Sequence, residues 1–410
     1  MSPIHLPPLG MREPGPPSKG PGFAHVCHKW AHGDRLEQRG ARNLHYPVRV
    51  TTAGPSTTGM ASSYTANSDF QRDSAASAIP QINELVAAVL HRNTDRAFTL
   101  VDYGTGPGSS GLALFATVIN EVRQADSARE VTVVHQDLPG NAWGDLLTRL
   151  RQDPDSYLAG DAPPPVLAAV GSFYRRSLPP GSVHFGMSFM AAHWLSVQER
   201  PLIRSSAALV DADSAEELRI AADAATDWQE FWRCREDELA SGGAIIVKCI
   251  GSLEDRRKST SHGLLEMLGG AFQAAAEAGL ISQQAADGYV LSEYPRTESE
   301  ARAPFDAGLV RQLRLDSAEV HPEPDPYRAQ YEEDRDASGY ARALVGFVRA
   351  FTESSVRRYL VHHRAGAADP GQTVDDVVDW IYRWCQDRWS TDPESHPFEA
   401  WTLTVIAHRV

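Results

Sequence analysis

The chain of 410 residues is 42% hydrophobic and 22% charged, which is typical of a globular protein and excludes global disorder. Its net charge is −14, so we do not expect nucleic acid as its partner. No apolar run approaches the roughly 20 residues that a membrane helix needs, and we expect no membrane association. The four cysteines fit no CxxC pattern, which favours a reducing compartment, the cytoplasm, over a disulfide framework.

The N-terminal segment differs in composition from the rest of the chain. Residues 1–55 hold nine of the 27 prolines and show no hydrophobic periodicity. This composition predicts that residues 1–59 form a poorly ordered tail, or that they are an artefact upstream of a natural start at Met60.

Helices and strands are then predicted to alternate. Apolar residues recur at helical spacing over 74–92, and short apolar runs bounded by turn residues predict strands. The predicted strands are 98–102, 131–135, 166–170, 183–187 and 244–250, and the helices between them are 112–123, 143–151 and 215–240. Such alternation predicts an α/β fold with a mostly parallel, doubly wound sheet.

The pattern changes after residue 251. Helices are predicted over 263–279, 340–359 and 374–389, and strands over 309–320 and 401–408. We therefore expect a cofactor-binding core over residues 60–250 and a mostly helical cap over 251–330. Residues 331–410 would supply C-terminal helices and the last core strand.

A glycine-rich turn follows the first predicted strand. Gly106-x-Gly108-x-x-Gly111 satisfies the dinucleotide fingerprint, whereas Gly104-x-Gly106-x-Gly108 after Asp102 is similar to the first motif of S-adenosylmethionine-dependent methyltransferases. Glycine is needed in both cases, because a Cβ would block the ligand or the turn. This segment predicts a nucleoside cofactor and leaves a nicotinamide-dependent oxidoreductase, or a purely structural turn, open.

Four further segments separate these alternatives. In chain order they are Tyr64-x-x-Asn67-Ser68-x-x-Gln71, His135-Gln136-Asp137-Leu138-Pro139-Gly140-Asn141, Gly171-Ser172-Phe173-Tyr174 and His193-Trp194-Leu195-Ser196. Together they resemble the SABATH family of small-molecule carboxyl methyltransferases, which includes salicylate and jasmonate methyltransferases. The resemblance runs from about residue 63 to the C-terminus and is strongest before residue 196.

The resemblance implies a Rossmann-like class I methyltransferase sheet with a helical cap inserted in the C-terminal half. It implies S-adenosylmethionine as cofactor, held by Tyr64, Ser68, Asp102, Gly104, Asp137, Leu138, Ser172 and Phe173. It implies an acceptor site made by Gln71, Met190, His193 and Trp194, with Gln71 and Trp194 donating to the acceptor carboxylate. The expected reaction makes the methyl ester of a small organic acid, and the resemblance also implies a homodimer.

The chemistry requires positioning more than proton transfer. A carboxylate with a pKa of roughly 4 is ionised at neutral pH, so it needs no general base and we expect no catalytic acid or base. Neutral amide and indole donors can aim it without the tight ion pair that would blunt its reactivity. We expect no metal, because Asp287-Gly288-Tyr289-Val290 lacks the amide ligand of the magnesium motif in some family members.

Two departures from the family pattern leave alternatives open. Thr105-Gly106-Pro107 replaces the usual Cys-Ser-Ser, and Met190 stands where the family has a tyrosine. The chain is then alternatively an N-methyltransferase of a small heterocycle, or a non-catalytic binder of the nucleoside cofactor. Trp194 and His193 are alternatively core residues, and Ser68 a helix N-cap.

Overall fold

The computed structural model describes residues 69–108, 111–160, 162–196, 215–255, 262–289, 291–363 and 372–410. All of them belong to one compact unit, residues 53–410. The predicted tail (residues 1–59), Tyr64 and Ser68 lie outside the described residues. No described helix is long and apolar enough to cross a membrane.

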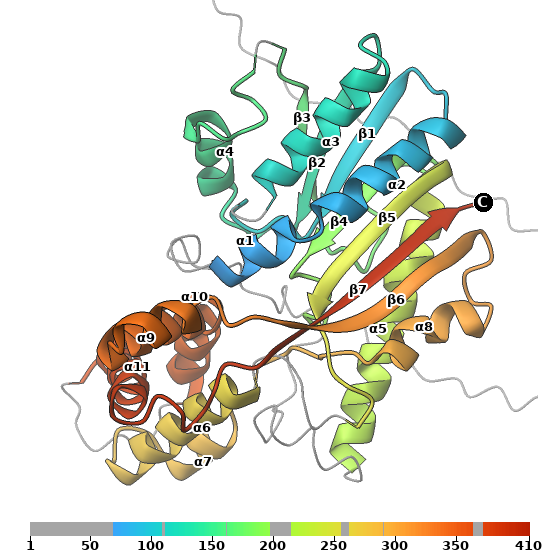
Figure 1. Ribbon diagram of the computed structural model, residues 1–410. Helices are drawn as coiled ribbons and strands as arrows, with labels where there is room; N and C mark the ends of the chain where they lie inside the picture. Colours follow the sequence, from blue (N-terminus) through green and yellow to red (C-terminus); the bar gives the residue numbers. More distant parts are fainter. Residues whose placement is uncertain are drawn as a thin grey trace, which may run out of the picture. The chain divides into compact units, whose positions relative to one another are not determined.

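A seven-stranded sheet runs through the core in the order β3-β2-β1-β4-β5-β7-β6 (Figure 1). The strands are β1 (Ala97–Tyr103), β2 (Glu130–Asp137), β3 (Val166–Val170), β4 (Val183–Phe189), β5 (Leu239–Ile250), β6 (Leu313–Glu323) and β7 (Ala400–Arg409). β1 pairs in parallel with β2 and β4, and β7 runs antiparallel to both β5 and β6. The α/β class and the mostly parallel sheet expected from the sequence are confirmed.

Helices cover both faces of this sheet, which is why its central strands are apolar on both sides. On one face, α2 (Ile79–Arg92), α3 (Leu112–Ala125) and α4 (Trp143–Gln152) share a core with Phe98 and Leu100 of β1. On the other face, α5 (Ala215–Glu238) and α8 (Glu298–Asp306) pack on Val101 and Tyr103. β4 is buried along its whole length.

A separate helical cluster, here called the cap, lies beyond the carboxyl ends of the parallel strands (Figure 1). It consists of α6 (His262–Glu277), α7 (Gln283–Asp287), α9 (Arg328–Asp334), α10 (Ala337–His363) and α11 (Val374–Thr391). These helices bury one common core, and Phe70 of α1 (Asp69–Ala76) lies in that core. Phe70 meets Phe347 and Phe398 edge to face, with ring centroids 5.8 and 5.2 Å apart.

The cap differs from the segment expected at 251–330. Residues 298–306 and 313–323 of that segment form α8 and β6, which belong to the sheet layer, and most cap helices follow residue 328. β6 is one of the two edge strands, and many of its side chains are exposed. The strand predicted at 309–320 is therefore present, but its pairing with β7 places it in the sheet and not in the cap.

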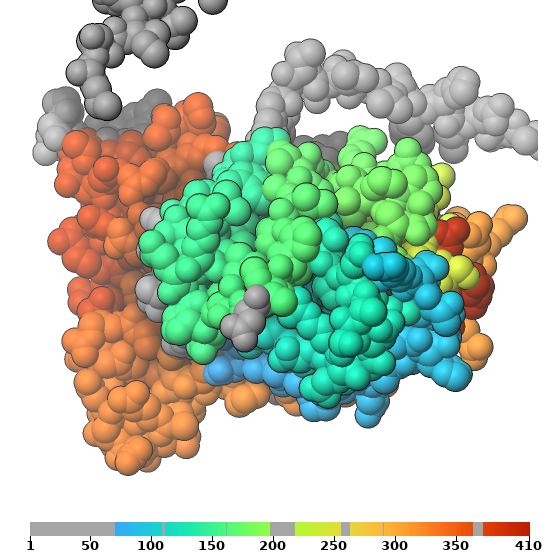
Figure 2. All heavy atoms as spheres, turned by 90° about the horizontal axis from the view of Figure 1, so that it is seen from above, coloured from blue at the N-terminus to red at the C-terminus, as the bar shows by residue number. Residues whose placement is uncertain are grey.

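Chain order reverses between β1 and β4, which are neighbours although β2 and β3 precede β4 in the chain. In an open α/β sheet, this reversal leaves a crevice at the carboxyl ends of the strands, where ligands bind. The loops after β1, β2, β3 and β4 all begin at this edge of the sheet, because the four strands are parallel. Figure 2 shows the face of the core over α3 and α4, the helices that follow the first two of these loops.

Candidate active site

The turn after β1 depends on its glycines. Gly104, Gly106 and Gly108 have φ angles of 81°, 54° and 83°, in the left-handed region that favours glycine. A Cβ on Gly104 would lie 2.4 Å from the Cβ of Ala191, which follows β4. A Cβ on Gly106 would meet no atom within 4 Å, so the turn borders open space at that point. The amide of Gly104 donates to the carbonyl of Gln136 at 2.8 Å, which joins the turn to β2.

Asp102 is a buried carboxyl beneath this turn. Its Oδ2 lies 4.0 Å from Nδ1 of His135, and the hydroxyl of Thr105 lies 2.8 Å from the same nitrogen. The other ring nitrogen of His135 is 2.8 Å from the hydroxyl of Tyr157. Burial raises the pKa of Asp102 to about 7, opposed by a hydrogen bond from Thr105 and reinforced by the charge of Asp137. Burial also lowers the pKa of His135 to about 4, so that imidazole is neutral at physiological pH.

Asp137 ends β2 and faces the same turn. Its Oδ2 accepts the amide of Gly106 at 2.7 Å, and its Oδ1 accepts the amide of Leu138 at 2.6 Å. Burial raises the pKa of Asp137, and these two hydrogen bonds oppose that rise. Because a carboxylate has about four lone-pair positions, Asp137 keeps the capacity to accept two further hydrogen bonds.

Ser172 and Phe173 lie in the loop after β3, and this loop reaches the glycine turn. Cε1 of Phe173 lies 3.3 Å from the position that a Cβ on Gly104 would occupy. The hydroxyl of Ser172 accepts the amide of Tyr174 at 3.2 Å. Arg235 of α5 donates to the carbonyl of Phe173 at 3.0 Å. Asp102, Gly104, Asp137 and Phe173 are thus brought together from three separate strand ends.

A buried ion pair that the sequence analysis missed holds this loop. Arg235 and Glu238 are both fully buried and lie 2.8 Å apart. Glu238 accepts the amides of Ser177 and Leu178 at 2.6 and 3.0 Å, and the hydroxyl of Tyr103 at 2.8 Å. The pair therefore ties the loop to the last residue of β1. Its signal in the sequence is two opposite charges three positions apart, at the end of a helix rich in aromatic residues.

The residues expected at the acceptor site come from α1 and from the loop after β4. Gln71 is 4% exposed, and its Oε1 is buried without a hydrogen-bond partner. His193 is also 4% exposed, its Nδ1 has no partner, and burial lowers its pKa to about 3. Met190 and Trp194 pack against the cap. Met190 has a φ of 52°, which strains a non-glycine residue, and its amide donates to the carbonyl of Lys248 at 2.7 Å.

Two side chains fix the backbone of the loop that carries Trp194. The hydroxyl of Tyr174 donates to the carbonyl of Trp194 at 2.6 Å. Arg296 donates to the carbonyl of Ala192 at 2.8 Å and to that of Ala224 in α5 at 3.2 Å. The sequence analysis did not identify either residue as part of the site. Their partners are main-chain carbonyls distant in sequence, which leave no pattern.

Lys248 anchors α1, and with it Gln71. Its Nζ donates to the carbonyl of Ser74 at 2.9 Å and to the hydroxyl of Ser77 at 2.7 Å. It also pairs with Glu323, at the end of β6, at 2.7 Å. The lysine is 6% exposed, so this is a buried, fully partnered charge joining α1 to the carboxyl ends of β5 and β6.

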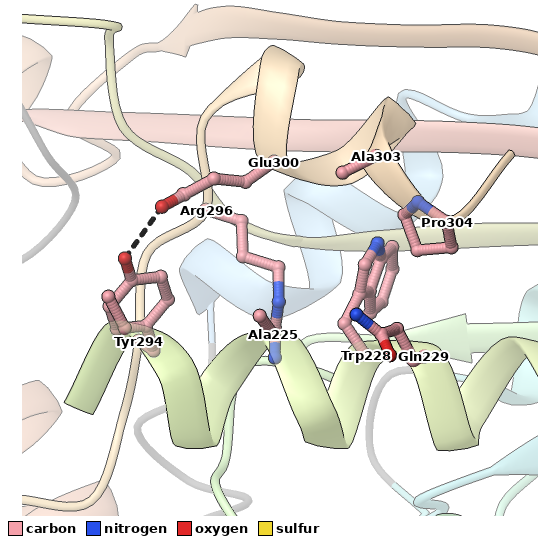
Figure 3. A pocket seen from close by; sticks show the side chains of 9 residues that line it. Ala225, Trp228, Gln229, Tyr294, Arg296, Glu300, Ala303 and Pro304 are labelled. Atoms are coloured by element: carbon pink, nitrogen blue, oxygen red, sulfur yellow. Dashed lines mark hydrogen bonds between the residues drawn. The ribbon is translucent and has the colours of Figure 1, made fainter. Parts of the chain in front are cut away.

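A small pocket between α5 and α8 is separate from these residues (Figure 3). Arg296 reaches into it between Tyr294 and Trp228, and the hydroxyl of Tyr294 donates to Glu300 at 2.7 Å (Figure 3). None of the predicted site residues lines it. The contacts of Arg296 beside this pocket, with Trp228 and with the carbonyl of Ala224, hold its segment against α5.

The glycine turn fits a cationic nucleoside ligand. Open space borders Gly106, and two carboxyls, Asp102 and Asp137, lie beside the turn; burial raises the pKa of both, and the charge of Asp137 adds to the rise at Asp102. A positively charged ligand would relieve that cost, because an opposite charge nearby favours the ionised carboxylate. Within the described ranges, no group of three or more His, Cys, Asp or Glu side chains is placed to hold a metal ion.

The strand order, the crevice and the glycine turn define a class I methyltransferase fold. A family described as SAM dependent carboxyl methyltransferase matches residues 56–365. The chain therefore belongs to this family, the SABATH methyltransferases, whose cofactor is S-adenosylmethionine and whose members methylate small acids on the carboxylate. The nicotinamide-dependent alternative is excluded by this membership.

Named relatives agree with the family. Gibberellic acid methyltransferase 2 of Arabidopsis thaliana is 26% identical over 326 residues, which cover 73% of this chain and 82% of the relative. Indole-3-acetate O-methyltransferase 1 of the same plant is 28% identical over 70% of this chain and 80% of its own length. A solved structure of loganic acid methyltransferase with SAH has a TM-score of 0.64 at 18% identity, covering 84% of this chain and 96% of that chain. This likeness confirms the fold.

Proposed function

We propose that Gln71 and Trp194 orient the carboxylate of a small, mainly apolar organic acid, which the enzyme converts to its methyl ester. The observation that carries this proposal is that polar side-chain groups of α1 and of the loop after β4 have no hydrogen-bond partner where these segments meet the cap. No described donor bonds the buried Oε1 of Gln71, so the side-chain NH₂ is the part of this amide that can donate to a carboxylate. In the described part of the chain the indole N–H of Trp194, the second donor, makes no hydrogen bond. The apolar cap beside Trp194 supports an acceptor with an apolar body.

The cofactor, when bound, supplies a methyl group on a positively charged sulfonium. We propose that it is held by Asp102, Gly104, Asp137, Leu138, Ser172 and Phe173. We propose the same role for Tyr64 and Ser68, which lie outside the described residues. Asp137 would accept hydroxyl hydrogen bonds, and Asp102 would ionise beside the positive charge. The turn at Gly104 lets the backbone approach the ligand closely.

The acid–base properties of the site favour a carboxylate acceptor over a ring nitrogen or a phenol. Those acceptors require a base, and His193 is the histidine nearest to Trp194 in the chain. With a pKa of about 3, His193 is a weak base at neutral pH. A carboxylate is already ionised, so its reaction depends on position alone. The N-methyltransferase alternative therefore has less support than ester formation.

The test is to incubate the protein with methyl-labelled S-adenosylmethionine and a panel of aromatic, indolic and fatty acids. We expect label in the organic extract that mild base releases, because a methyl ester is base-labile. Base-stable label would instead indicate an N- or ether-methylated product. Cofactor binding without any transferred label would indicate a binder that has lost catalysis.

We also infer a cytoplasmic location and a homodimer. The location is supported by Cys234, Cys249 and Cys385, which are free, buried thiols and suit a reducing compartment. The homodimer is supported by the family resemblance alone. Sedimentation of the purified enzyme tests it.

A further inference from the structure

A short backbone pairing places Glu293 directly opposite Trp194. The amide of Tyr294 donates to the carbonyl of His193, and the amide of Leu195 donates to the carbonyl of Ser292, both at 2.9 Å. These two bonds flank an antiparallel bridge between Trp194 and Glu293. The two residues thus form a non-hydrogen-bonded pair, the arrangement in which facing side chains lie closest.

The bridge and the contacts of the neighbouring residues set the direction of the two side chains. Leu195 and Tyr294 share a small cluster with Ala224 of α5. Trp194 and Leu291, by contrast, pack into the cap. Since the facing residues of an antiparallel bridge project to the same side, Glu293 points with Trp194 toward the cap side. Figure 3 shows Tyr294 turned toward Glu300 and α5.

Glu293 is a buried acid with an unpartnered carboxyl oxygen. It is 5% exposed, and its Oε1 is buried without a hydrogen-bond partner. In the described ranges no cation pairs with it, and burial raises its pKa to about 8. At neutral pH it is therefore an uncharged carboxylic acid, which can donate one hydrogen bond and accept others.

Such a group is unusual in a folded protein, because a buried polar atom without a partner costs about 1–3 kcal/mol. Glu293 lies opposite Trp194. His193, which directly precedes Trp194 in the chain, also has a ring nitrogen, Nδ1, without a partner. The open position of Glu293 therefore lies next to the group proposed to hold the acceptor carboxylate. A molecule bound beside Trp194 could satisfy Glu293.

We propose that Glu293 is a specificity-determining residue that hydrogen-bonds a hydroxyl group which the acceptor acid carries in addition to its carboxylate. This inference rests on the proposed function of Trp194. A hydroxyl matches an uncharged carboxylic acid, because each can donate to and accept from the other. A charged Glu293 would instead repel the acceptor carboxylate, so the neutral acid suits this position. An acceptor without the hydroxyl would leave Glu293 unsatisfied and would be disfavoured.

The test compares matched acids with and without a hydroxyl. The probes are benzoate against its three monohydroxy isomers, and a medium-chain fatty acid against its ω-hydroxy derivative. For the wild-type enzyme, we expect kcat/KM for at least one hydroxy acid to exceed that of its parent about 10- to 100-fold. Glu293→Leu should abolish this preference by lowering kcat/KM for the hydroxy acid to that for the parent acid.

Two further variants keep the test independent of folding. Glu293→Gln keeps a neutral donor and acceptor and should retain most of the preference. Glu277→Leu, at an exposed position of α6, should behave like wild type. Binding of S-adenosylhomocysteine, measured by calorimetry, should be equal in all of them.

The outcomes separate the two proposals. Wild-type enzyme that methylates parent and hydroxy acids equally, or Glu293→Leu enzyme that keeps the preference, overturns the role of Glu293 and leaves ester formation intact. Loss of parent and hydroxy acid turnover alike in Glu293→Leu, with cofactor binding retained, also overturns it. Wild-type enzyme that methylates none of the acids refutes the proposed function itself.

Discussion

At the scale of single residues, the environment of Gln71 predicts most clearly what a substitution does to turnover. It is buried on α1, and its amide oxygen has no partner. If its amide positions the acceptor, Gln71→Ala should reduce kcat/KM at least about 10-fold, since hydrogen bonds to charged groups contribute about 1.5–3 kcal/mol. Cofactor affinity, measured by calorimetry with S-adenosylhomocysteine, should not change.

The matched control is Gln81→Ala, because Gln81 is exposed on α2. It should leave both turnover and cofactor affinity unchanged. Equal turnover in Gln71→Ala and wild type would exclude the carboxylate-orienting role. Loss of cofactor affinity in Gln71→Ala would show instead that the residue supports the cofactor or the fold.

At the scale of elements, the loops after β3 and β4 are coupled through Tyr174. Its hydroxyl donates to the carbonyl of Trp194 at 2.6 Å, while its own amide donates to Ser172. Tyr174→Phe should lower kcat about fivefold, because it removes a net hydrogen bond of about 1 kcal/mol that positions Trp194. Tyr331→Phe on α9 is the control and should have wild-type kinetics. An unchanged kcat in Tyr174→Phe would show that Trp194 is positioned by other contacts.

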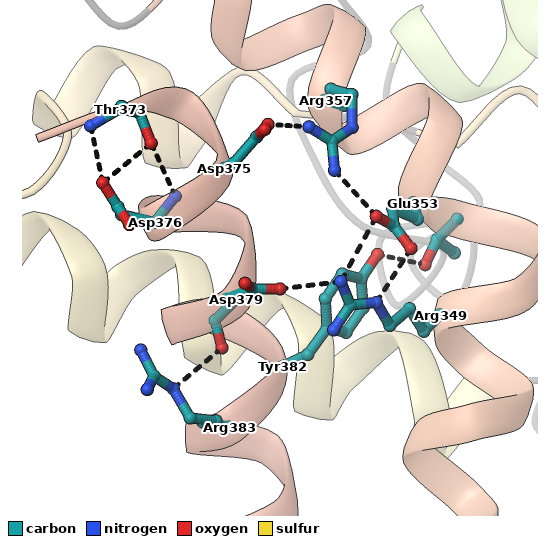
Figure 4. Close-up of polar contacts among 10 residues, drawn as sticks. Arg349, Glu353, Arg357, Thr373, Asp375, Asp376, Asp379, Tyr382 and Arg383 are labelled. Atoms are coloured by element: carbon teal, nitrogen blue, oxygen red, sulfur yellow. Dashed lines mark hydrogen bonds and ion pairs between the residues drawn. The ribbon is translucent and has the colours of Figure 1, made fainter.

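The cap is joined by ion pairs between α10 and α11 (Figure 4). Arg349 contacts Glu353 at 2.8 Å and Asp379 at 2.7 Å, and Arg357 contacts Glu353 at 2.9 Å and also pairs with Asp375. The arginine side chains are 36% and 40% exposed, so water screens these pairs.

The cap thus allows a comparison of exposed and buried polar contacts. Arg357→Met should lower the free energy of unfolding by less than about 1 kcal/mol. Tyr382→Phe breaks a buried hydrogen bond of 2.8 Å with Thr352 and leaves that hydroxyl with its bond to Val348, so about 1 kcal/mol should be lost. Urea unfolding measures both. A larger loss in Arg357→Met than in Tyr382→Phe would contradict this ranking.

For the whole molecule, the buried titratable groups predict how stability depends on pH. His135 and His193 have pKa values of about 4 and 3 in place of 6.5, because burial disfavours the imidazolium. The unfolded chain then binds protons that the folded chain does not, so their contribution is complete above about pH 6.5 and falls below it.

The buried carboxyls act in the opposite direction. Burial raises the pKa of Asp102 from 3.8 to about 7 and that of Glu293 from 4.5 to about 8, so the folded chain retains protons that the unfolded chain has lost. Between pH 6.5 and 8 only this effect remains among the four groups. The free energy of unfolding should fall over that interval, by at most about 1.4 kcal/mol per pH unit for each retained proton.

Urea unfolding at pH 6.5 and pH 8 measures this slope. Glu293→Gln should make it shallower, because the amide does not titrate, whereas Glu277→Gln at an exposed position should leave it unchanged. An identical slope in wild type and Glu293→Gln would show that Glu293 is already ionised at pH 6.5 in the folded protein.

The sequence by itself determined the fold class, the family resemblance and the glycine turn. Apolar runs such as 98–102 and 183–187 are readable because strands buried between two helical layers must be apolar on both faces. The glycines at 104, 106 and 108 are readable because few other residues tolerate a positive φ. The candidate site segments around Gln71, Asp137, Phe173 and Trp194 could be predicted because their order along the chain matches a known family.

Only the tertiary structure decided which side chains support the site and where the cap lies. Arg296 contacts carbonyls that are 104 and 72 residues away in the chain, so no local pattern can reveal it. Phe70 is in the cap although it precedes the core, and β6 joins the sheet although it follows cap helices. Glu293 is an ordinary glutamate in the sequence. Its burial opposite Trp194, set by two backbone hydrogen bonds distant in sequence, is what makes it chemically distinctive.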